Sequence, residues 1–219
     1  MKIACITHRN WAIEIYEKIR ETYQGKHDFL IWKNKDEFGS DKLKKFKPDL
    51  ILWFGWSWIV EDDFVNDYES IMLHPSPLPK YRGGSPIQNQ IINGEKLGAV
   101  SLFRMNKDID KGDLYQQLTM SLDGTLEDIF KRISILGFSA TCNVINGNYS
   151  LSSQDHSKST YFKRRLPHES EITLSEIQNK PAEYLYNKIR MLSDPYPNSY
   201  IRTIDHKKLV IKSADIENL

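Results

Sequence analysis

Short apolar runs alternate with amphipathic segments over the first two thirds of the chain. Runs of apolar, partly β-branched residues between polar turns predict buried strands, which span residues 2–7, 28–32, 50–56, 70–74, 98–105 and 113–122. Apolar residues that recur every three or four positions predict helices, which span residues 10–23, 40–46, 85–95 and 125–145. Strands that alternate with helices in this way predict an α/β fold with an open, mostly parallel twisted sheet over residues 1–150.

The last third of the chain has a different pattern. Residues 151–180 are polar and lack periodicity, so we expect a connecting loop there. A helix is predicted over 181–193, and two strands over 194–203 and 207–216 follow it with a hairpin turn between them. This αββ appendage, residues 181–219, is too small to fold alone. We therefore expect it to pack on the main domain or on a second subunit, and to act as the dimerisation element of a homodimer.

Composition and charge narrow the function classes. The 219 residues carry 30 Lys and Arg against 29 Asp and Glu, a formal net charge of +1, which gives no electrostatic reason to expect a nucleic-acid partner. The opening apolar run is too short for a signal peptide, and no run approaches the ~20 apolar residues that span a membrane. Cys5 and Cys142 lie in apolar runs without metal-ligand spacing, which predicts buried reduced thiols, a cytoplasmic protein and no metal site.

A single histidine, His74, closes the predicted strand 70–74 and is followed by three prolines. In open α/β sheets, ligands bind outside the carboxyl ends of the strands, so His74 and the turns after strands 2–7 and 50–56 are expected to share one rim. Asp110 follows after one further helix and strand, and a parallel path would return it to that rim. A carboxylate beside an imidazole raises its basicity, so the pair could shuttle a proton during attack by an amine. The spacing alone is also compatible with a solvated acidic loop and a surface histidine.

Two stretches carry a family resemblance: "HPSPLPKYRGGSP", which begins at His74, and "GAVSLFRMNKDIDKGDLY", which begins at Gly98. They resemble the folate-dependent formyltransferases, whose shared pattern is Asn-x-His-Pro-Ser-x-Leu-Pro-x-x-Arg-Gly with Asp-x-Gly on a later loop. The match covers roughly residues 48–145. The resemblance implies a Rossmann-like core, 10-formyltetrahydrofolate as the co-substrate and an amine as the acceptor. It also implies that His74 is the acid/base group and that Asp110 orients it or relays the proton.

Position 72 departs from this pattern, because Met72 stands where the family has an asparagine. In the family that amide stabilises the oxyanion of the tetrahedral intermediate, whereas a thioether cannot donate a hydrogen bond. Losing one oxyanion donor typically costs about 10² to 10³ in rate. Three interpretations remain open. Another donor, such as a backbone N–H, protonated His74, Asn89 or Gln88, takes its place; the protein is slow or inactive; or residue 72 is not the natural one.

The strings "RGGSPIQNQI" and "DPYPNSYI" most resemble the nucleotide-sugar N-formyltransferase branch. The first turn, "THRNWA", lacks the glycine-rich phosphate loop expected of a glycinamide ribonucleotide enzyme, and residues 150–219 leave no room for the β-barrel domain of the tRNA-modifying enzymes. The implied acceptor is a dTDP-amino-deoxysugar, such as dTDP-4-amino-4,6-dideoxyglucose or a relative, used for surface polysaccharide, O-antigen or lipopolysaccharide synthesis. The alternatives are a catalytically impaired relative that still binds folate or nucleotide, and a glycinamide ribonucleotide formyltransferase.

The rim loops supply the expected binding residues. By resemblance, the folate is held by Phe54, Gly55, Trp56, Ser57, Ile59, Leu78, Asp108 and Asp110. The acceptor is expected to contact Arg9, Asn10, Trp11, Lys80, Arg82, Gly83, Gly84, Gln88, Tyr196 and Asn198. The two glycines are expected to let a phosphate or sugar approach the backbone closely. The basic run "FKRR" (162–165) is interpreted first as a solvated face and second as a phosphate contact.

Overall fold

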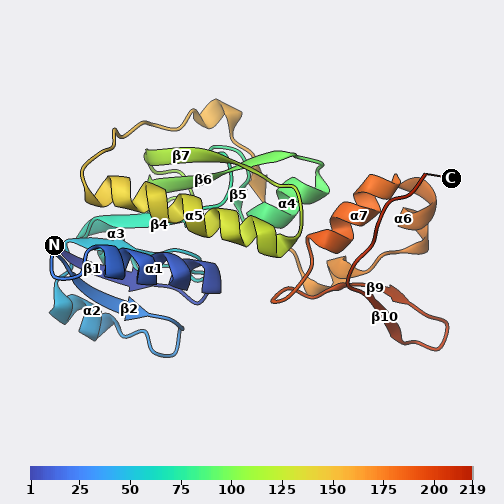
Figure 1. The fold of residues 1–219 in the computed structure, drawn as a ribbon, viewed down its shortest axis with the longest axis horizontal. Helices are drawn as coiled ribbons and strands as arrows, with labels where there is room; N and C mark the ends of the chain where they lie inside the picture. Colours follow the sequence, from blue (N-terminus) through green and yellow to red (C-terminus); the bar gives the residue numbers. More distant parts are fainter. Residues whose placement is uncertain (219) are drawn as a thin grey trace.

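A six-stranded sheet forms the centre of the computed structural model, which describes residues 1–218 (Figure 1). In spatial order its strands are β2 (Asp28–Trp32), β1 (Lys2–Ile6), β3 (Leu50–Leu52), β4 (Ser70–His74), β6 (Leu97–Arg104) and β7 (Leu114–Ser121). The first four strands run parallel, whereas β6 is antiparallel to β4 and β7 is antiparallel to β6. The predicted α/β fold with an open, mostly parallel sheet is confirmed.

Helices cover both faces of this sheet. They are α1 (Asn10–Thr22), α2 (Ser40–Phe46), α3 (Asp62–Asn66), α4 (Pro86–Ile92) and α5 (Leu126–Ile145). Because side chains alternate along a strand, Ile3 and Cys5 pack into a core with α1 and α5, while Ala4 and Ile6 pack into a second core with α2 and α3. The same alternation in β4 turns Leu73 towards the first core and Met72 towards the second. His74 therefore lies on the same side of the sheet as Met72.

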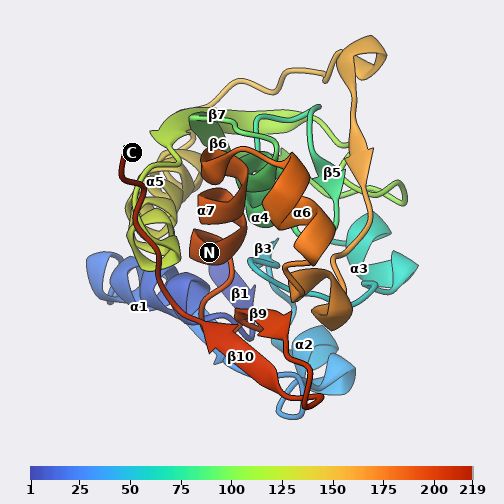
Figure 2. The same ribbon diagram turned by 90° about the vertical axis from the view of Figure 1, so that its right-hand side faces the viewer.

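The C-terminal appendage is larger than predicted. It contains α6 (Leu174–Asn179), α7 (Ala182–Arg190), β9 (Ser199–Arg202) and β10 (Lys208–Ile211), and the two strands form an antiparallel hairpin that projects from the body (Figures 1 and 2). The sequence interpretation missed α6, although Thr173 and Glu176 form a capping box at its start. The predicted strand over 194–203 begins only at Ser199, because Pro195 and Pro197 have no N–H to donate.

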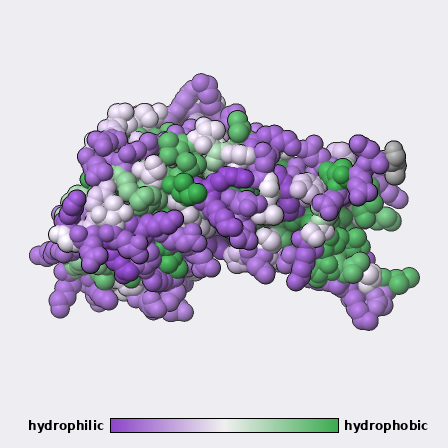
Figure 3. All heavy atoms as spheres, viewed as in Figure 1, coloured by the Kyte–Doolittle hydropathy of each residue, from purple (hydrophilic) through white to green (hydrophobic). Residues whose placement is uncertain are grey.

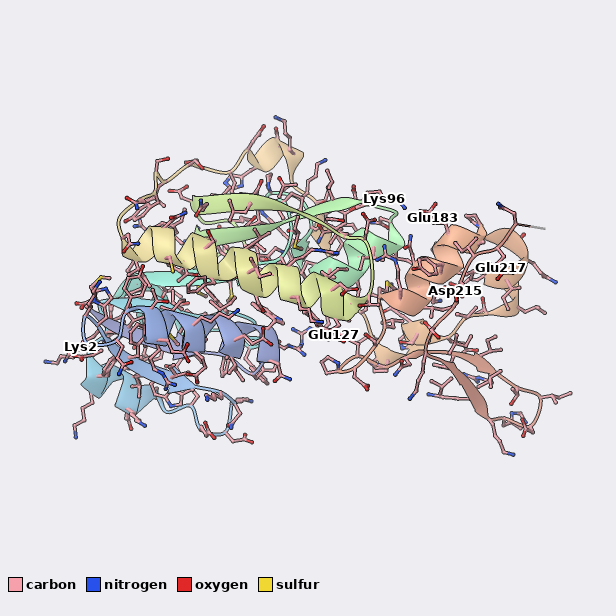
Figure 4. The ribbon with its side chains drawn as sticks, in the orientation of Figure 1. Lys2, Lys96, Glu127, Glu183, Asp215 and Glu217 are labelled. Carbon is pink, nitrogen blue, oxygen red and sulfur yellow. The ribbon has the colours of Figure 1, made fainter. Side chains whose placement is uncertain are left out.

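Contacts between the appendage and the core fix its position. Lys96, just before β6, forms an ion pair with Glu183 of α7 (Figure 4). The Arg190 Nη1 donates to the carbonyl oxygen of Leu122 at 2.7 Å, and Leu192 belongs to the main core cluster. These contacts agree with the expectation that the appendage packs on the main domain.

The connecting segment contains one pairing that the sequence did not suggest. The short strand β8 (Tyr161–Phe162) runs parallel to β5 (Arg82–Gly83), the turn after His74. Short 3₁₀ helices at His156–Lys158 and Pro167–Ser170 flank this pair. The pairing draws the basic segment 163–165 back to the main domain.

The structure decides two smaller predictions. The N-cap position of α1 is Arg9 and not Asn10, which is exposed in the first turn. Cys5 and Cys142 are unpaired thiols, and burial raises the pKa of Cys5. Among residues 1–218, no helix combines the length and apolarity that crossing a bilayer requires.

Candidate active site

A cavity of about 830 Å³ opens where β1, β3 and β4 end. Its wall is made by the loops after these strands and by residues 83–88, 105–110, 161–167 and 195–197. Pockets that hold small molecules typically have volumes of about 300–1,000 Å³, so this one can hold a folate-sized ligand or a large part of two substrates. The three rim loops expected to meet do meet here.

His74 lies against this cavity and is only 6% exposed. Its Nε2 lies 2.7 Å from the carbonyl oxygen of Tyr81, and its Nδ1 lies 3.6 Å from the Oδ2 of Asp110. The same Oδ2 accepts a hydrogen bond from the Gly83 N–H at 2.8 Å. Both ring nitrogens thus face acceptors. A neutral imidazole has one N–H and can satisfy one of them, whereas an imidazolium can donate to both.

The turn that carries Tyr81 is held by its own hydrogen bonds. The Ser76 hydroxyl donates to the carbonyl of Lys80 at 2.8 Å, and Gln117 Nε2 donates to the carbonyl of Leu78 at 2.9 Å. The prolines limit the backbone freedom of the same turn. The imidazole is consequently held in a single orientation before any substrate arrives.

Asp110 reaches His74 by a path that differs from the expected parallel crossover. Because β6 is antiparallel to β4, the loop after β6 must turn back to bring the carboxylate to the cavity. Gln154 braces this loop, since its Nε2 donates to the carbonyl oxygens of Asp110 at 3.0 Å and Gly112 at 2.7 Å. Arg82 in turn donates to Gln154 Oε1 at 2.6 Å.

Met72 lines the cavity beside His74, as the register of β4 requires. Three amide side chains on α4, not far along the chain from Met72, are candidates to replace the missing asparagine as a hydrogen-bond donor. Asn89 Nδ2 donates to the carbonyl of Gly84 at 2.9 Å, and Gln90 Nε2 donates to the carbonyls of Pro75 and Pro86 at 2.8 and 2.9 Å. Gln88 also lines the cavity, and its buried Nε2 has no hydrogen-bond partner among residues 1–218.

Most of the residues singled out in the sequence lie in the wall of this cavity. They are Arg9, Trp11, Gly55, Trp56, Ser57, Ile59, Met72, His74, Gly83, Gly84, Gln88, Asp108, Asp110 and Tyr196. These residues lie together because several strands of the sheet end at the same rim.

Six other residues lie outside the wall: Phe54, Leu78, Asn10, Lys80, Arg82 and Asn198. Phe54 is fully buried in the main core, and Leu78 is buried within the proline-rich turn. Arg82, expected to bind phosphate, is only 3% exposed, and its guanidinium is used by Gln154 and His156. Arg82 therefore braces the connecting segment, and its side chain does not line the cavity.

The two glycines after Arg82 leave room for protein backbone. A Cβ on Gly83 would lie 2.4 Å from the carbonyl oxygen of Phe162, and a Cβ on Gly84 would lie 2.4 Å from the backbone of Arg164. The expected space for a phosphate or sugar at these positions is filled by β8 and by Arg164. Segment 161–167 thereby joins the cavity wall, which the sequence interpretation missed because a two-residue pairing with β5 leaves no local signal.

Aromatic rings from the loops after β1 and β3 pack together at the rim. The ring of His8 packs edge-on against Trp58, with centroids 4.7 Å apart, and lies 6.3 Å from Trp56. Burial, together with the positive charges of Arg9 and Arg164, lowers the pKa of His8 to about 4. His8 is therefore neutral near pH 7, and its Nε2 lies 3.3 Å from the Ser57 hydroxyl.

Comparisons with known proteins identify the family of the chain. The formyl transferase family model matches residues 12–145, which is more than half of the chain. The bifunctional polymyxin resistance protein ArnA of Wigglesworthia glossinidia brevipalpis is 34% identical over 182 residues, 79% of this chain and 27% of that protein. The methionyl-tRNA formyltransferase of Bacillus velezensis is 34% identical over 171 residues, 73% of this chain and 51% of that protein. The chain thus spans between about a quarter and a half of these two curated relatives.

Two solved structures extend the comparison to nearly the whole chain. A methionyl-tRNA formyltransferase from Clostridium thermocellum has a TM-score of 0.89 and 31% identity, and covers 99% of this chain and 94% of that chain. A sugar N-formyltransferase from Shewanella sp FDAARGOS_354 has a TM-score of 0.78 and 17% identity, covers 100% and 99%, and shares the fold. The family match and the near-complete overlap with the Clostridium structure lead to one conclusion: the chain belongs to the formyl transferase family.

Proposed function

We propose that the protein is an N-formyltransferase that moves a formyl group from 10-formyltetrahydrofolate to the amine of a nucleotide-linked amino-deoxysugar. The observation that carries the proposal is the contact of His74 with Asp110 in the wall of a large cavity. A buried imidazole held between two acceptors is suited to take a proton from an attacking amine and return it to a leaving nitrogen. Family membership supplies the type of reaction.

The residues of the cavity fit a folate. Trp56, Trp58 and Ile59 offer apolar surface, and Ile59 is 96% exposed at the cavity wall, where a ligand can cover it. When bound, 10-formyltetrahydrofolate supplies the electrophilic formyl carbon. The protein's part is to hold the reactants together, exclude water and move the proton.

His74 and Asp110 divide the proton handling. The carboxylate lies beside Nδ1 and orients the imidazole, while the Gly83 N–H fixes the carboxylate. The carbonyl of Tyr81 fixes the opposite edge of the ring. This arrangement lets His74 gain and lose a proton without rotating.

Gln88 is our choice for the oxyanion donor that Met72 cannot provide. Its amide is buried in the same wall, and its Nε2 is the donor on α4 that the described part of the chain leaves unused. An unpaired buried amide costs stability unless a ligand uses it. A developing oxyanion would give it a partner in the transition state, where a hydrogen bond accelerates the reaction most.

Two acceptors deserve direct comparison. The sugar N-formyltransferase shares the fold over its whole length, which is compatible with a sugar amine as the acceptor. The more specific choice, a nucleotide-linked sugar such as dTDP-4-amino-4,6-dideoxyglucose for O-antigen synthesis, rests on the resemblance of "RGGSPIQNQI" and "DPYPNSYI". Methionyl-tRNA is the second candidate, because the Clostridium chain of nearly equal extent is named for that activity. The small size of the C-terminal appendage therefore does not distinguish a sugar nucleotide from methionyl-tRNA as the acceptor.

An acceptor screen tests the proposal. Purified protein with 10-formyltetrahydrofolate is offered dTDP-amino-deoxysugars, methionyl-tRNA and glycinamide ribonucleotide, and mass spectrometry follows the gain of one formyl group. We expect transfer to a dTDP-amino-sugar. Transfer to methionyl-tRNA or glycinamide ribonucleotide alone would replace the acceptor, and binding of folate without any transfer would mark an impaired relative.

A homodimer formed through the C-terminal piece completes the proposal. Exposed apolar side chains gather over this end of the molecule (Figure 3), where Leu174 on α6 is 69% exposed and Leu209 on β10 is 59% exposed. Covering them with a second copy would remove this surface from water. Light scattering would test the dimer, and Leu209→Lys should yield a monomer.

A further inference from the structure

Three cations gather in the cavity wall without a counter-ion. Arg9 follows β1, whereas Lys163 and Arg164 follow β8, and all three line the cavity. The ion pairs found among residues 1–218 use other side chains. Arg165, next in sequence, differs because its guanidinium donates to the carbonyl of Glu169 at 3.0 Å. We call Arg9, Lys163 and Arg164 the basic cluster.

The fold brings the basic cluster together from distant parts of the sequence. Arg9 and Arg164 both act on the same imidazole, since each lowers the pKa of His8. The backbone of Arg164 is fixed by its close approach to Gly84, and the next N–H donates to Ser85 Oγ at 3.1 Å. Positive charges held in place before binding are a recognisable feature of anion sites.

Neighbouring groups indicate the kind of anion. The Arg9 guanidinium lies 5.5 Å from the ring centroid of Tyr196, which also lines the cavity and offers a face on which a base can stack. Asp108 and Asp110 line the same cavity and carry the opposite charge. A ligand that fits both has an anionic group, a flat ring and an amine that is cationic in water.

We propose that the basic cluster binds the diphosphate of a nucleoside-diphosphate-linked acceptor, with the base of the nucleotide against Tyr196. The inference rests on the proposed function, because it assigns the acceptor's phosphates to a place in the cavity of that same site. Arg side chains suit this role, since a guanidinium can donate two parallel hydrogen bonds to a phosphate. The binding step needs no turnover and can be measured by itself.

The test is a titration calorimetry series on the full chain. The probes are dTDP, inorganic pyrophosphate and 5-formyltetrahydrofolate, and the variants are Arg9→Ala, Lys163→Ala and Arg164→Ala. Each variant is expected to weaken dTDP and pyrophosphate about tenfold to a hundredfold and to leave the folate probe within about twofold. Lys18→Ala removes the same charge from the exposed face of α1 and should change none of the three affinities. Circular dichroism melts establish that each variant is folded.

The outcomes separate the inference from the proposed function. The proposal that the basic cluster binds the diphosphate would be refuted by either of two results. One is that all three folded variants bind dTDP and pyrophosphate with unchanged affinity. The other is that the wild-type protein binds neither. A loss confined to the folate probe would assign the cluster to the carboxylates of the folate instead. Binding of dTDP that depends on the cluster, without formyl transfer to any sugar nucleotide, would uphold the cluster and refute the proposed function.

Discussion

The amide of Gln88 gives an unusual prediction, because its loss should affect stability and activity in opposite directions. The side chain is 2% exposed, and its Nε2 has no partner in the described part of the chain. Gln88→Leu replaces the amide with an apolar group of similar size. Since an unsatisfied buried donor costs about 1–3 kcal/mol, the substitution is expected to raise the free energy of unfolding by about 1 kcal/mol. Urea denaturation measures this change.

The same substitution should slow turnover. If Gln88 donates to the oxyanion, its removal costs about 2.7–4 kcal/mol in the transition state, or about 10² to 10³ in kcat. Gln90→Leu is the matched control on the same helix. It removes the hydrogen bonds to Pro75 and Pro86, so it should lower the free energy of unfolding by about 1–3 kcal/mol.

Two results would refute this reasoning. One is a Gln88→Leu variant that keeps the wild-type kcat, which would leave Gln88 with no role in the chemistry. The other is a rate gain of about 10² or more in Met72→Asn, which would mean that the native site lacks a working donor. With Gln88 in that role, Met72→Asn should change kcat less than about tenfold.

Three further changes test other parts of the site. Asp110→Asn keeps an oxygen that can accept from the Gly83 N–H but removes the negative charge beside His74. We therefore expect kcat to fall about 10²- to 10⁴-fold with little change in Tm. A wild-type kcat in this variant would show that His74 and Asp110 do not handle the proton. Gly84→Ala would place a methyl group 2.4 Å from the backbone of Arg164, so the free energy of unfolding should fall by about 1–3 kcal/mol. Because Arg164 would be displaced, the KM for the acceptor should also rise. An unaltered KM would show that the contact between Gly84 and Arg164 does not matter for acceptor binding. The pKa of His8 is lowered from 6.5 to about 4 in the fold, so the unfolded state binds more protons between these pH values and the free energy of unfolding should fall as the pH falls through that range. The His8→Gln variant should lose this part of the pH dependence in urea titrations.

The sequence predicted the sheet and its main helices well, because their signals are local. The strand Ser70–His74 was predicted to the residue, since an apolar run there is bounded by a charged turn and by prolines. The helix Leu126–Ile145 was predicted over residues 125–145 from its wide apolar face. Local periodicity reports burial on one face, and burial decides these elements.

The parts that the sequence could not predict depend on contacts between distant residues. Nothing near Arg82 indicates that Gln154 and His156 occupy its guanidinium, so a buried brace was taken for a phosphate ligand. The basic run 162–165 has no periodicity, and its place in the cavity depends on the pairing with β5. Antiparallel pairing of β6 was equally hidden, because periodicity does not report strand direction.

A direct measurement of formyl transfer to a sugar nucleotide is the sharpest test of the proposed function. The measurement is kcat/KM for dTDP-4-amino-4,6-dideoxyglucose with 10-formyltetrahydrofolate, followed by mass spectrometry and compared with methionyl-tRNA under the same conditions. We expect a product with one added formyl group, a higher kcat/KM for the sugar nucleotide, and loss of transfer in the folded Asp110→Asn variant. Formylation of methionyl-tRNA by a folded protein that leaves every dTDP-amino-sugar unmodified would contradict it.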